Sequence, residues 1–334
     1  MTYPKRRSIG NEKTFARSGR RLAAAISDTA CCHLINFIQW QLPDRTNSPK
    51  ELADYVTRCG SLTRPEFYPK EPIRALAIEH DLLSWSSPLK SEFSENSIAR
   101  ARAFISRRGW SSPTVFFLHA LMSASDFGYR RIAHRFNENG WNAVLVHLPF
   151  HYTRVPTGYF NGALALTSEL IRNAETIRQA LMEMRQLLEL FRSRGAERFG
   201  LIGTSFGGWI GSLLLTLEPD FEFAALLQPL VDMEDAIWRS PAAVTIRSRL
   251  RHHGVEPGVS RPHAHLSSPL HGRPLMNPNR IYVVAGEYDR IAPVSTLRTL
   301  ADTWNLEDIQ IVPQGHFGYV AMGTVLRRVL VSCQ

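Results

Sequence analysis

Short, nearly all-apolar runs recur along the chain from about residue 111, and longer stretches with helical periodicity separate them. The runs are β-branched or aromatic and do not alternate with polar residues, so they predict strands buried on both faces. Strands that alternate with helices are typical of a mostly parallel sheet flanked by helices. The predicted strands are residues 114–118, 143–147, 199–202, 223–228, 281–285 and 308–312. The predicted helices are residues 127–139, about 166–194, a segment opening after Ser205, 294–304 and about 319–331.

Two regions depart from this rhythm. Residues 1–80 have helical or irregular patterns with proline and charge, which predicts a basic tail and a helical extension ahead of a main domain at 81–334. Residues from about 232 to 279 interrupt the strand and helix alternation and contain six prolines, so we interpret them as an inserted cap.

Composition places the chain among folded globular proteins, with 44% hydrophobic and 21% charged residues. The net charge of +9 favours acidic partners without choosing among them. Basic residues are dense at the N-terminus, which predicts first a solvated tail and second a peripheral contact with a membrane surface. These residues are Lys5, Arg6, Arg7, Lys13, Arg17, Arg20 and Arg21.

Other features argue against secretion, membrane insertion and metal binding. Residues 22–40 are apolar but are interrupted by Asp28, His33 and Asn36, so they make a poor signal peptide, and no run is long enough for a membrane span. The four cysteines have no C-x-x-C spacing, which favours free thiols in a reducing cytoplasm. The cysteines are Cys31, Cys32, Cys59 and Cys333. No nucleic-acid-binding motif is present in the sequence either.

A Gly-x-Ser-x-Gly motif at residues 203–207 has the context that its chemistry needs. It follows the predicted strand 199–202 and precedes a helix-like segment, as a nucleophile elbow requires. The glycines two residues before and after Ser205 leave room for a strained turn, and the amides that open the helix can face a developing negative charge. We therefore predict Ser205 as a nucleophile, with a purely structural turn as the alternative.

An acid and a base follow in the order expected for a serine hydrolase. Asp289 comes after the predicted strand 281–285, and His316 lies on a glycine-flanked loop after the last predicted strand. The carboxyl ends of parallel strands share one edge of a sheet, so the three groups are expected to meet there. Glu287 and Asp232 are alternative acids for orienting His316.

The oxyanion of such a reaction needs two backbone N–H donors. Phe206, directly after the nucleophile, is the first predicted donor. The second is expected in the loop after strand 114–118, with Leu121 preferred and Met122 as the alternative.

In order, spacing and motif, residues from about 111 to 330 resemble the α/β-hydrolase superfamily, over roughly two thirds of the chain. The resemblance implies the α/β-hydrolase fold and a Ser-Asp-His triad. The superfamily usually has glycine after the histidine of the first loop, whereas here Ala120 follows His119. The element from Pro149 to Pro156 resembles a Pro-aromatic-x-x-x-Arg-x-Pro segment found at this place in a poorly characterised branch.

Two loops and the cap are the candidates for substrate contact. We predict that the substrate is contacted by His119, Met122, His147, His151 and Arg154. The alternative for Arg154 is that it anchors its own loop to a carboxylate or carbonyl. In the cap, His263 and His265 lack a third ligand nearby, so no metal is predicted, and the many arginines favour a solvated basic lid.

These features predict a cytoplasmic serine hydrolase that needs no cofactor and cleaves a carboxylic ester, with a small-molecule, lipid or other anionic ester as substrate. A thioesterase, peptidase or acyltransferase would use the same triad. A non-catalytic ligand-binding protein on the hydrolase fold is the alternative from another class. The oligomeric state and the role of residues 1–80 stay open.

Overall fold

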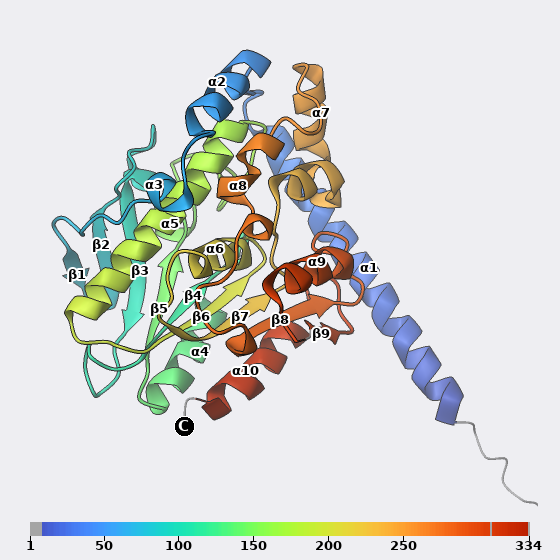
Figure 1. The fold of residues 1–334 in the computed structure, drawn as a ribbon. Helices are drawn as coiled ribbons and strands as arrows, with labels where there is room; N and C mark the ends of the chain where they lie inside the picture. Colours follow the sequence, from blue (N-terminus) through green and yellow to red (C-terminus); the bar gives the residue numbers. More distant parts are fainter. Residues whose placement is uncertain (1–8, 308, 333–334) are drawn as a thin grey trace, which may run out of the picture.

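The computed structural model of the chain describes residues 9–307 and 309–332. Within these ranges the centre is a nine-stranded sheet in the order β1-β2-β3-β5-β4-β6-β7-β8-β9. The six strands from β4 to β9 run parallel to one another, and β1, β2 and β3 form an antiparallel edge that joins them through the antiparallel pair of β3 and β5 (Figure 1). Lys5, Arg6, Arg7 and Cys333 lie outside the described residues.

The parallel part of the sheet confirms the six strands predicted from the apolar runs, each within two residues of its expected bounds. Residue 308, where the last one was expected to begin, lies outside the described ranges. The side chains of β4 and β5 are buried along their whole length, as expected for strands covered on both faces. The observed strands are β4 (Thr114–Leu118), β5 (Asn142–His147), β6 (Phe199–Thr204), β7 (Phe221–Leu227), β8 (Ile281–Gly286) and β9 (Ile309–Val312).

The hydrophobic pattern does not predict the antiparallel edge, which consists of β1 (Ala77–Glu79), β2 (Leu82–Ser86) and β3 (Ile98–Phe104). The buried positions of β3 are all alanines and alternate with the half-buried Arg100 and Arg102, so the β-branched or aromatic residues that mark a strand are confined to its two ends. Because β1 pairs with β2, the sheet already starts at Ala77, inside the segment expected to be an extension.

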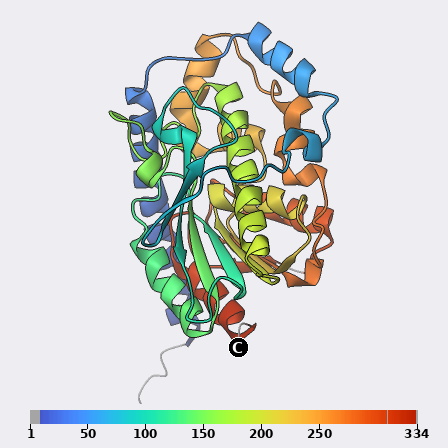
Figure 2. The ribbon, with the colours of Figure 1, turned by 90° about the vertical axis from the view of Figure 1, so that its left-hand side faces the viewer.

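Helices cover both faces of the sheet. α4 (Phe127–Glu138) and α10 (Val320–Ser332) pack on one face with the same apolar cluster. The other face is covered by α5 (Leu170–Ser193), α6 (Phe206–Leu215) and α9 (Val294–Trp304). Figure 2 shows α5 running along the sheet. All five helices correspond to segments predicted from periodicity.

The N-terminal segment and the cap are both helical and contact each other. The segment contains α1 (Ile9–Gln41), α2 (Pro49–Cys59) and α3 (Arg64–Phe67), and the cap between β7 and β8 contains α7 (Val244–His252), α8 (Ala264–Ser267) and several single turns. α1 packs along α7 and the turn before it, while its first part extends away from the body (Figure 1). No helix within the described ranges is long and apolar enough to cross a bilayer.

Candidate active site

Ser205 lies in the sharp turn between β6 and α6. Its backbone has φ 52° and ψ −113°, a conformation that costs free energy in a residue with a Cβ. Hydrogen bonds hold the turn in place: the Ser205 N–H donates to Leu227 O at 2.8 Å, and its carbonyl accepts from the Leu230 N–H at 3.2 Å. The strained turn therefore has the geometry of a nucleophile elbow.

Gly207 allows this turn to lie directly on the end of β4. A Cβ at Gly207 would lie 2.2 Å from Leu118 O and 2.5 Å from His119 O, both of them backbone atoms that cannot move aside. Any side chain at this position would therefore push the elbow away from the loop that follows β4. That loop is where the second oxyanion donor was predicted.

The structure brings the three predicted triad residues together from three strand ends. Ser205 Oγ lies 2.8 Å from His316 Nε2, and His316 Nδ1 lies 2.8 Å from Asp289 Oδ2. Ser205 is 6% exposed, the His316 side chain is also 6% exposed, and the Asp289 side chain is fully buried. A nearly dry hydrogen-bonded serine, imidazole and carboxylate can activate a hydroxyl by proton transfer.

Backbone and side-chain donors fix the Asp289 carboxylate. Its Oδ1 accepts from the N–H groups of Ile291 and Ala292 at 2.8 and 2.9 Å. Its Oδ2 accepts from Gln228 Nε2 as well as from His316. Gln228 also donates to Gly315 O at 3.0 Å, so it joins the loop of the acid to the loop of the base. Its position as the last residue of the predicted strand 223–228 was the only signal for it in the sequence.

The two alternative acids are placed differently. The Asp232 carboxylate accepts from the N–H of Glu234 at 2.7 Å, at the beginning of the cap segment. Glu287 uses its backbone N–H to bind Val312 O at the end of β9. His316 Nδ1 contacts Asp289, so the geometry favours Asp289 among the three candidates.

Asp28 of α1 holds the loop of His316, a contact that sequence reasoning misses. Its carboxylate accepts from the His316 N–H at 2.8 Å and from the Phe317 N–H at 3.3 Å, and Asp28 is only 6% exposed. A Cβ at Gly315 would lie 2.4 Å from Asp28 Oδ2, so glycine is required at that position for this approach. The only sequence signal is that an acidic residue interrupts the apolar stretch 22–40.

Charges around His316 favour its protonated form. Burial opposes protonation, but the charge and hydrogen bond of Asp289, with a further contribution from Asp28, hold the pKa of His316 above its usual 6.5. The imidazole is therefore a stronger proton acceptor than a free histidine.

The predicted oxyanion donors lie at the elbow and in the loop after β4. Phe206 is the first residue of α6, so its N–H has no carbonyl partner within the helix. The Met122 N–H already donates to His151 Nε2 at 3.1 Å, which leaves Leu121 as the better second donor. The positive φ of this loop falls on Met122 (53°) and not on Ala120, so alanine is tolerated where the superfamily usually has glycine.

His119 and His151 support this loop from inside the protein. His119 Nε2 accepts from the Leu148 N–H at 3.2 Å, and His151 Nδ1 lies 2.8 Å from Pro149 O. Both side chains are fully buried. Burial lowers the pKa of His119 to about 4 and holds that of His151 well below 6.5, so both are neutral at pH 7. Neutral imidazoles can accept the N–H bonds that shape the loop.

His147 and Arg154 hold the neighbouring segment after β5. His147 Nδ1 lies 2.8 Å from Thr153 Oγ1, and burial lowers the pKa of His147 to about 3. Arg154 is fully buried and binds both carboxylate oxygens of Glu183 at 2.6 and 2.8 Å. It also donates to His147 O and Asn96 O. These contacts favour the anchoring interpretation of Arg154 over substrate contact.

Two of the cap arginines bind carbonyl groups within the protein, and Arg239, Arg251, Arg261 and Arg273 are exposed. Arg247 donates to Ile237 O and Ser240 O, and Arg249 donates to the carbonyls of Trp40 and Leu42 at the end of α1. The rings of His263 and His265 are 6.5 Å apart. Across residues 9–307 and 309–332, no group of three or more His, Cys, Asp or Glu side chains is placed to hold a metal.

Solved structures identify the fold. Acetyl xylan esterase 1 from a Thermoanaerobacterium species superposes with a TM-score of 0.56 at 14% identity, over 90% of this chain and 98% of that chain. An acetyl xylan esterase from a Paenibacillus species gives a TM-score of 0.55 at 14% identity, over 89% and 98%. The chain has the α/β-hydrolase fold, which confirms at the level of the fold the resemblance seen in the sequence.

Closer relatives by sequence are two curated proteins of Mycobacterium tuberculosis, Rv2627c and MT2702, both named as uncharacterized. Each is 30% identical over 205 residues, which cover 59% of this chain and 47% of the relative. The chain thus spans about half the length of these relatives. No protein-family model matches it.

Proposed function

We propose that the protein is a serine hydrolase that cleaves carboxylic esters through an acyl-enzyme intermediate. The observation that carries the proposal is the hydrogen-bonded Ser205, His316 and Asp289 arrangement on a strained elbow. A ligand-binding protein would gain nothing from a serine held at positive φ against a histidine. The names of the two structural neighbours, both acetyl xylan esterases, support an ester as the substrate.

In the proposed reaction, His316 Nε2 takes the proton of Ser205 as Oγ attacks the ester carbonyl carbon. The carbonyl oxygen becomes an oxyanion that accepts from the N–H groups of Phe206 and Leu121. The tetrahedral intermediate then collapses, the C–O bond to the alcohol breaks, and His316 returns the proton to the leaving oxygen. Asp289 keeps the imidazole oriented with Nδ1 protonated and stabilises its cation.

Water completes the cycle by the same steps. His316 removes a proton from a water molecule, and the water oxygen attacks the acyl carbon. The bond between the acyl carbon and Ser205 Oγ then breaks, the carboxylic acid leaves, and His316 returns the proton to Oγ. All proton transfers use His316, so no cofactor enters the scheme. A thioester or an amide would follow the same route with a different leaving group.

A panel of substrates tests the proposed function. Purified protein is assayed on p-nitrophenyl acetate, butyrate and octanoate, on an acyl thioester, on a p-nitroanilide and on a diacyl phospholipid. We expect turnover of the simple esters, with the carboxylic acid as product, and little cleavage of the anilide, because the proposal assigns esters to this site. A folded protein that turns over none of the esters would contradict the proposal.

The Asp28→Asn variant tests how the N-terminal helix acts on the proposed base. Removing this negative charge lowers the pKa of His316, so the acid limb of the pH profile of kcat/KM should move to lower pH. The limb moves to lower pH because the reaction needs neutral His316, and in the variant the imidazolium loses its proton at a lower pH. A purely structural role for Asp28 would lower the rate without moving the limb.

The control for this experiment is Asp44→Asn, which removes a half-exposed carboxylate paired with His253 outside the candidate site. We expect its acid limb to coincide with that of the unmodified protein. An Asp28→Asn profile that keeps the original acid limb, or moves it to higher pH, would show that Asp28 does not act on the charge of His316.

A further inference from the structure

The outward face of α1 is apolar although it faces solvent. Within the described residues, five of the fourteen exposed large hydrophobic side chains belong to this one helix. Their exposed fractions lie between 55% and 67%, and Phe37 and Trp40 stack with ring centroids 6.2 Å apart. Such a concentration marks a contact surface, whereas single exposed apolar residues are ordinary. The five residues are Leu22, Ile26, Leu34, Phe37 and Trp40.

Helical geometry places most of these side chains in one line. At 100° per residue, Leu22, Ile26, Phe37 and Trp40 fall within an arc of about 60°, and the line is about 27 Å long. We call these four residues the apolar stripe. A stripe of this width and length is typical of a helix that lies flat on an apolar surface.

Other residues of α1 already bind the helix to the body of the protein, so the stripe stays on the surface. Asn36 donates to Pro241 O at 2.9 Å and accepts from the Thr245 N–H at 2.9 Å. Gln39 donates to Ala163 O and Leu166 O, both at 2.9 Å, and Asp28 holds the His316 loop. Two of the three polar residues that interrupt the apolar pattern, Asp28 and Asn36, therefore fix α1 to the body with the stripe outward, whereas His33 is exposed.

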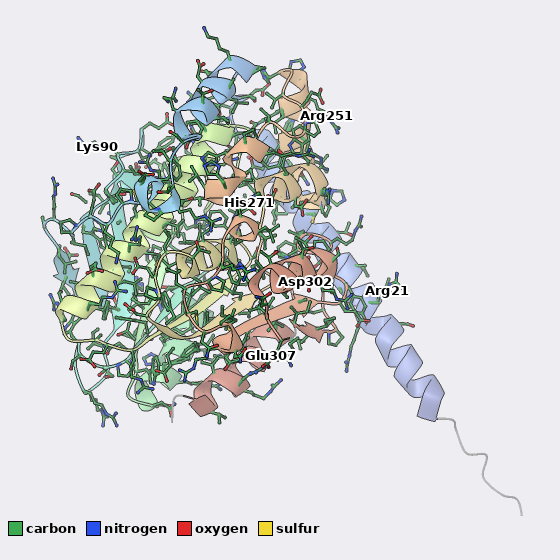
Figure 3. All side chains as sticks on the ribbon, in the orientation of Figure 1. Arg21, Lys90, Arg251, His271, Asp302 and Glu307 are labelled. Carbon is green, nitrogen blue, oxygen red and sulfur yellow. The ribbon has the colours of Figure 1, made fainter. Side chains whose placement is uncertain are left out.

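Positive charge lies near both ends of the stripe. The first 21 residues contain seven basic residues and one acidic residue, and Arg20 and Arg21 are exposed immediately before Leu22. At the other end, Arg251 is exposed on α7, and Arg249 of the same helix binds Trp40 O at the end of α1. Figure 3 labels Arg21 on α1 and Arg251 on α7.

We propose that α1 docks the protein on an anionic phospholipid surface, with the apolar stripe at the level of the headgroups and the basic residues near lipid phosphates. Leucine, isoleucine, phenylalanine and tryptophan on one face, accompanied by arginine, are the composition of an interfacial helix. Tryptophan in particular favours the membrane–water interface. The charge complementarity selects an anionic surface over a neutral one, because each basic residue near it adds to the attraction.

Docking in this way would bring the candidate active site to the membrane. The same helix carries the stripe on one side and Asp28, in contact with the His316 loop, on another. The helix itself would then lie between the lipid surface and the His316 loop. The docking itself needs no turnover, so it stands or falls independently of the proposed function.

Vesicle flotation tests the proposal with the full chain. Protein is mixed with vesicles of phosphatidylcholine alone or of phosphatidylcholine with phosphatidylglycerol, at low and at high salt. We expect binding to the phosphatidylglycerol vesicles at low salt and weaker binding at high salt. Phe37→Gln/Trp40→Gln should lower the partition coefficient by at least about tenfold, and Arg20→Gln/Arg21→Gln should weaken binding mainly at low salt.

The matched control is Leu275→Gln/Val331→Gln, which removes two comparably exposed apolar side chains from other parts of the surface. It should bind vesicles as the unmodified protein does. Unchanged melting temperatures would show that all variants fold, since every altered side chain is exposed. Size-exclusion chromatography with light scattering measures the oligomeric state and so tests the alternative that the stripe binds a second copy of the chain. The proposal is overturned if no vesicle is bound, if Phe37→Gln/Trp40→Gln binds normally, or if that variant only dissociates a dimer.

Discussion

Replacing Ser205 with alanine is expected to lower kcat for ester hydrolysis by roughly four to six orders of magnitude. The variant loses the proposed attacking oxygen, while the proposed oxyanion donors, the N–H groups of Phe206 and Leu121, remain. Only the slow attack of water on a bound ester would be left. The initial rate of p-nitrophenol release from p-nitrophenyl acetate, compared at equal concentrations of folded protein, measures the effect.

A change at a different serine provides the control. Ser193→Ala removes an exposed hydroxyl at the end of α5, which donates only to Leu190 O, and should leave kcat unchanged. The melting temperature of Ser205→Ala should match or exceed that of the unmodified protein, because only a hydroxyl of a strained residue is lost. A Ser205→Ala variant that retains more than about one hundredth of the activity would contradict the proposed nucleophile.

Replacing Glu183 with alanine is expected to destabilise the protein by about 3–5 kcal/mol. Arg154 and Glu183 are 0% and 1% exposed and form a bidentate ion pair, and Glu183 also accepts from Ser87 and Gln179. The variant leaves the Arg154 guanidinium buried without a counter-charge. Denaturation in urea, monitored by circular dichroism, measures the change in the free energy of unfolding.

Two further variants separate the buried pair from an ordinary surface effect. Glu189→Ala removes a carboxylate 44% exposed on the same helix, with partners Arg192 and Lys70, and should cost no more than about 1 kcal/mol. Arg154→Met/Glu183→Leu removes both charges and should recover most of the loss. If Glu183→Ala and Glu189→Ala have the same free energy of unfolding, the buried ion pair of Arg154 and Glu183 does not stabilise the protein as expected.

The parallel sheet and the proximity of Ser205, Asp289 and His316 could be predicted because both depend on local patterns. Runs such as residues 114–118 are buried on both faces, so nearly every position is apolar, and the strand is visible without a partner. Ser205, Asp289 and His316 each follow such a run. Parallel strands align their carboxyl ends at one edge, so three separate sequence positions predict one site.

Features that depend on long-range contacts could not be predicted. Asp28 meets His316 across 288 residues, and nothing in the sequence around either residue indicates the pairing. Gln228 occupies a strand end without a motif of its own. β3 is stabilised by its neighbours β2 and β5 although its buried positions are alanines, so tertiary pairing outweighs its weak strand propensity. The roles of Asp28 and Asn36 in α1 likewise become visible only from the groups that they bind in the His316 loop and in the cap.

Reaction with a fluorophosphonate, followed by peptide mass spectrometry, tests the central claim most directly, because the reagent phosphonylates a serine only when a neighbouring base activates it. We expect one stoichiometric adduct, on Ser205, formed faster as the pH rises through the pKa of His316 and lost in the Ser205→Ala and His316→Ala variants. A folded protein that forms no adduct, or one that carries the adduct on another serine, would contradict it.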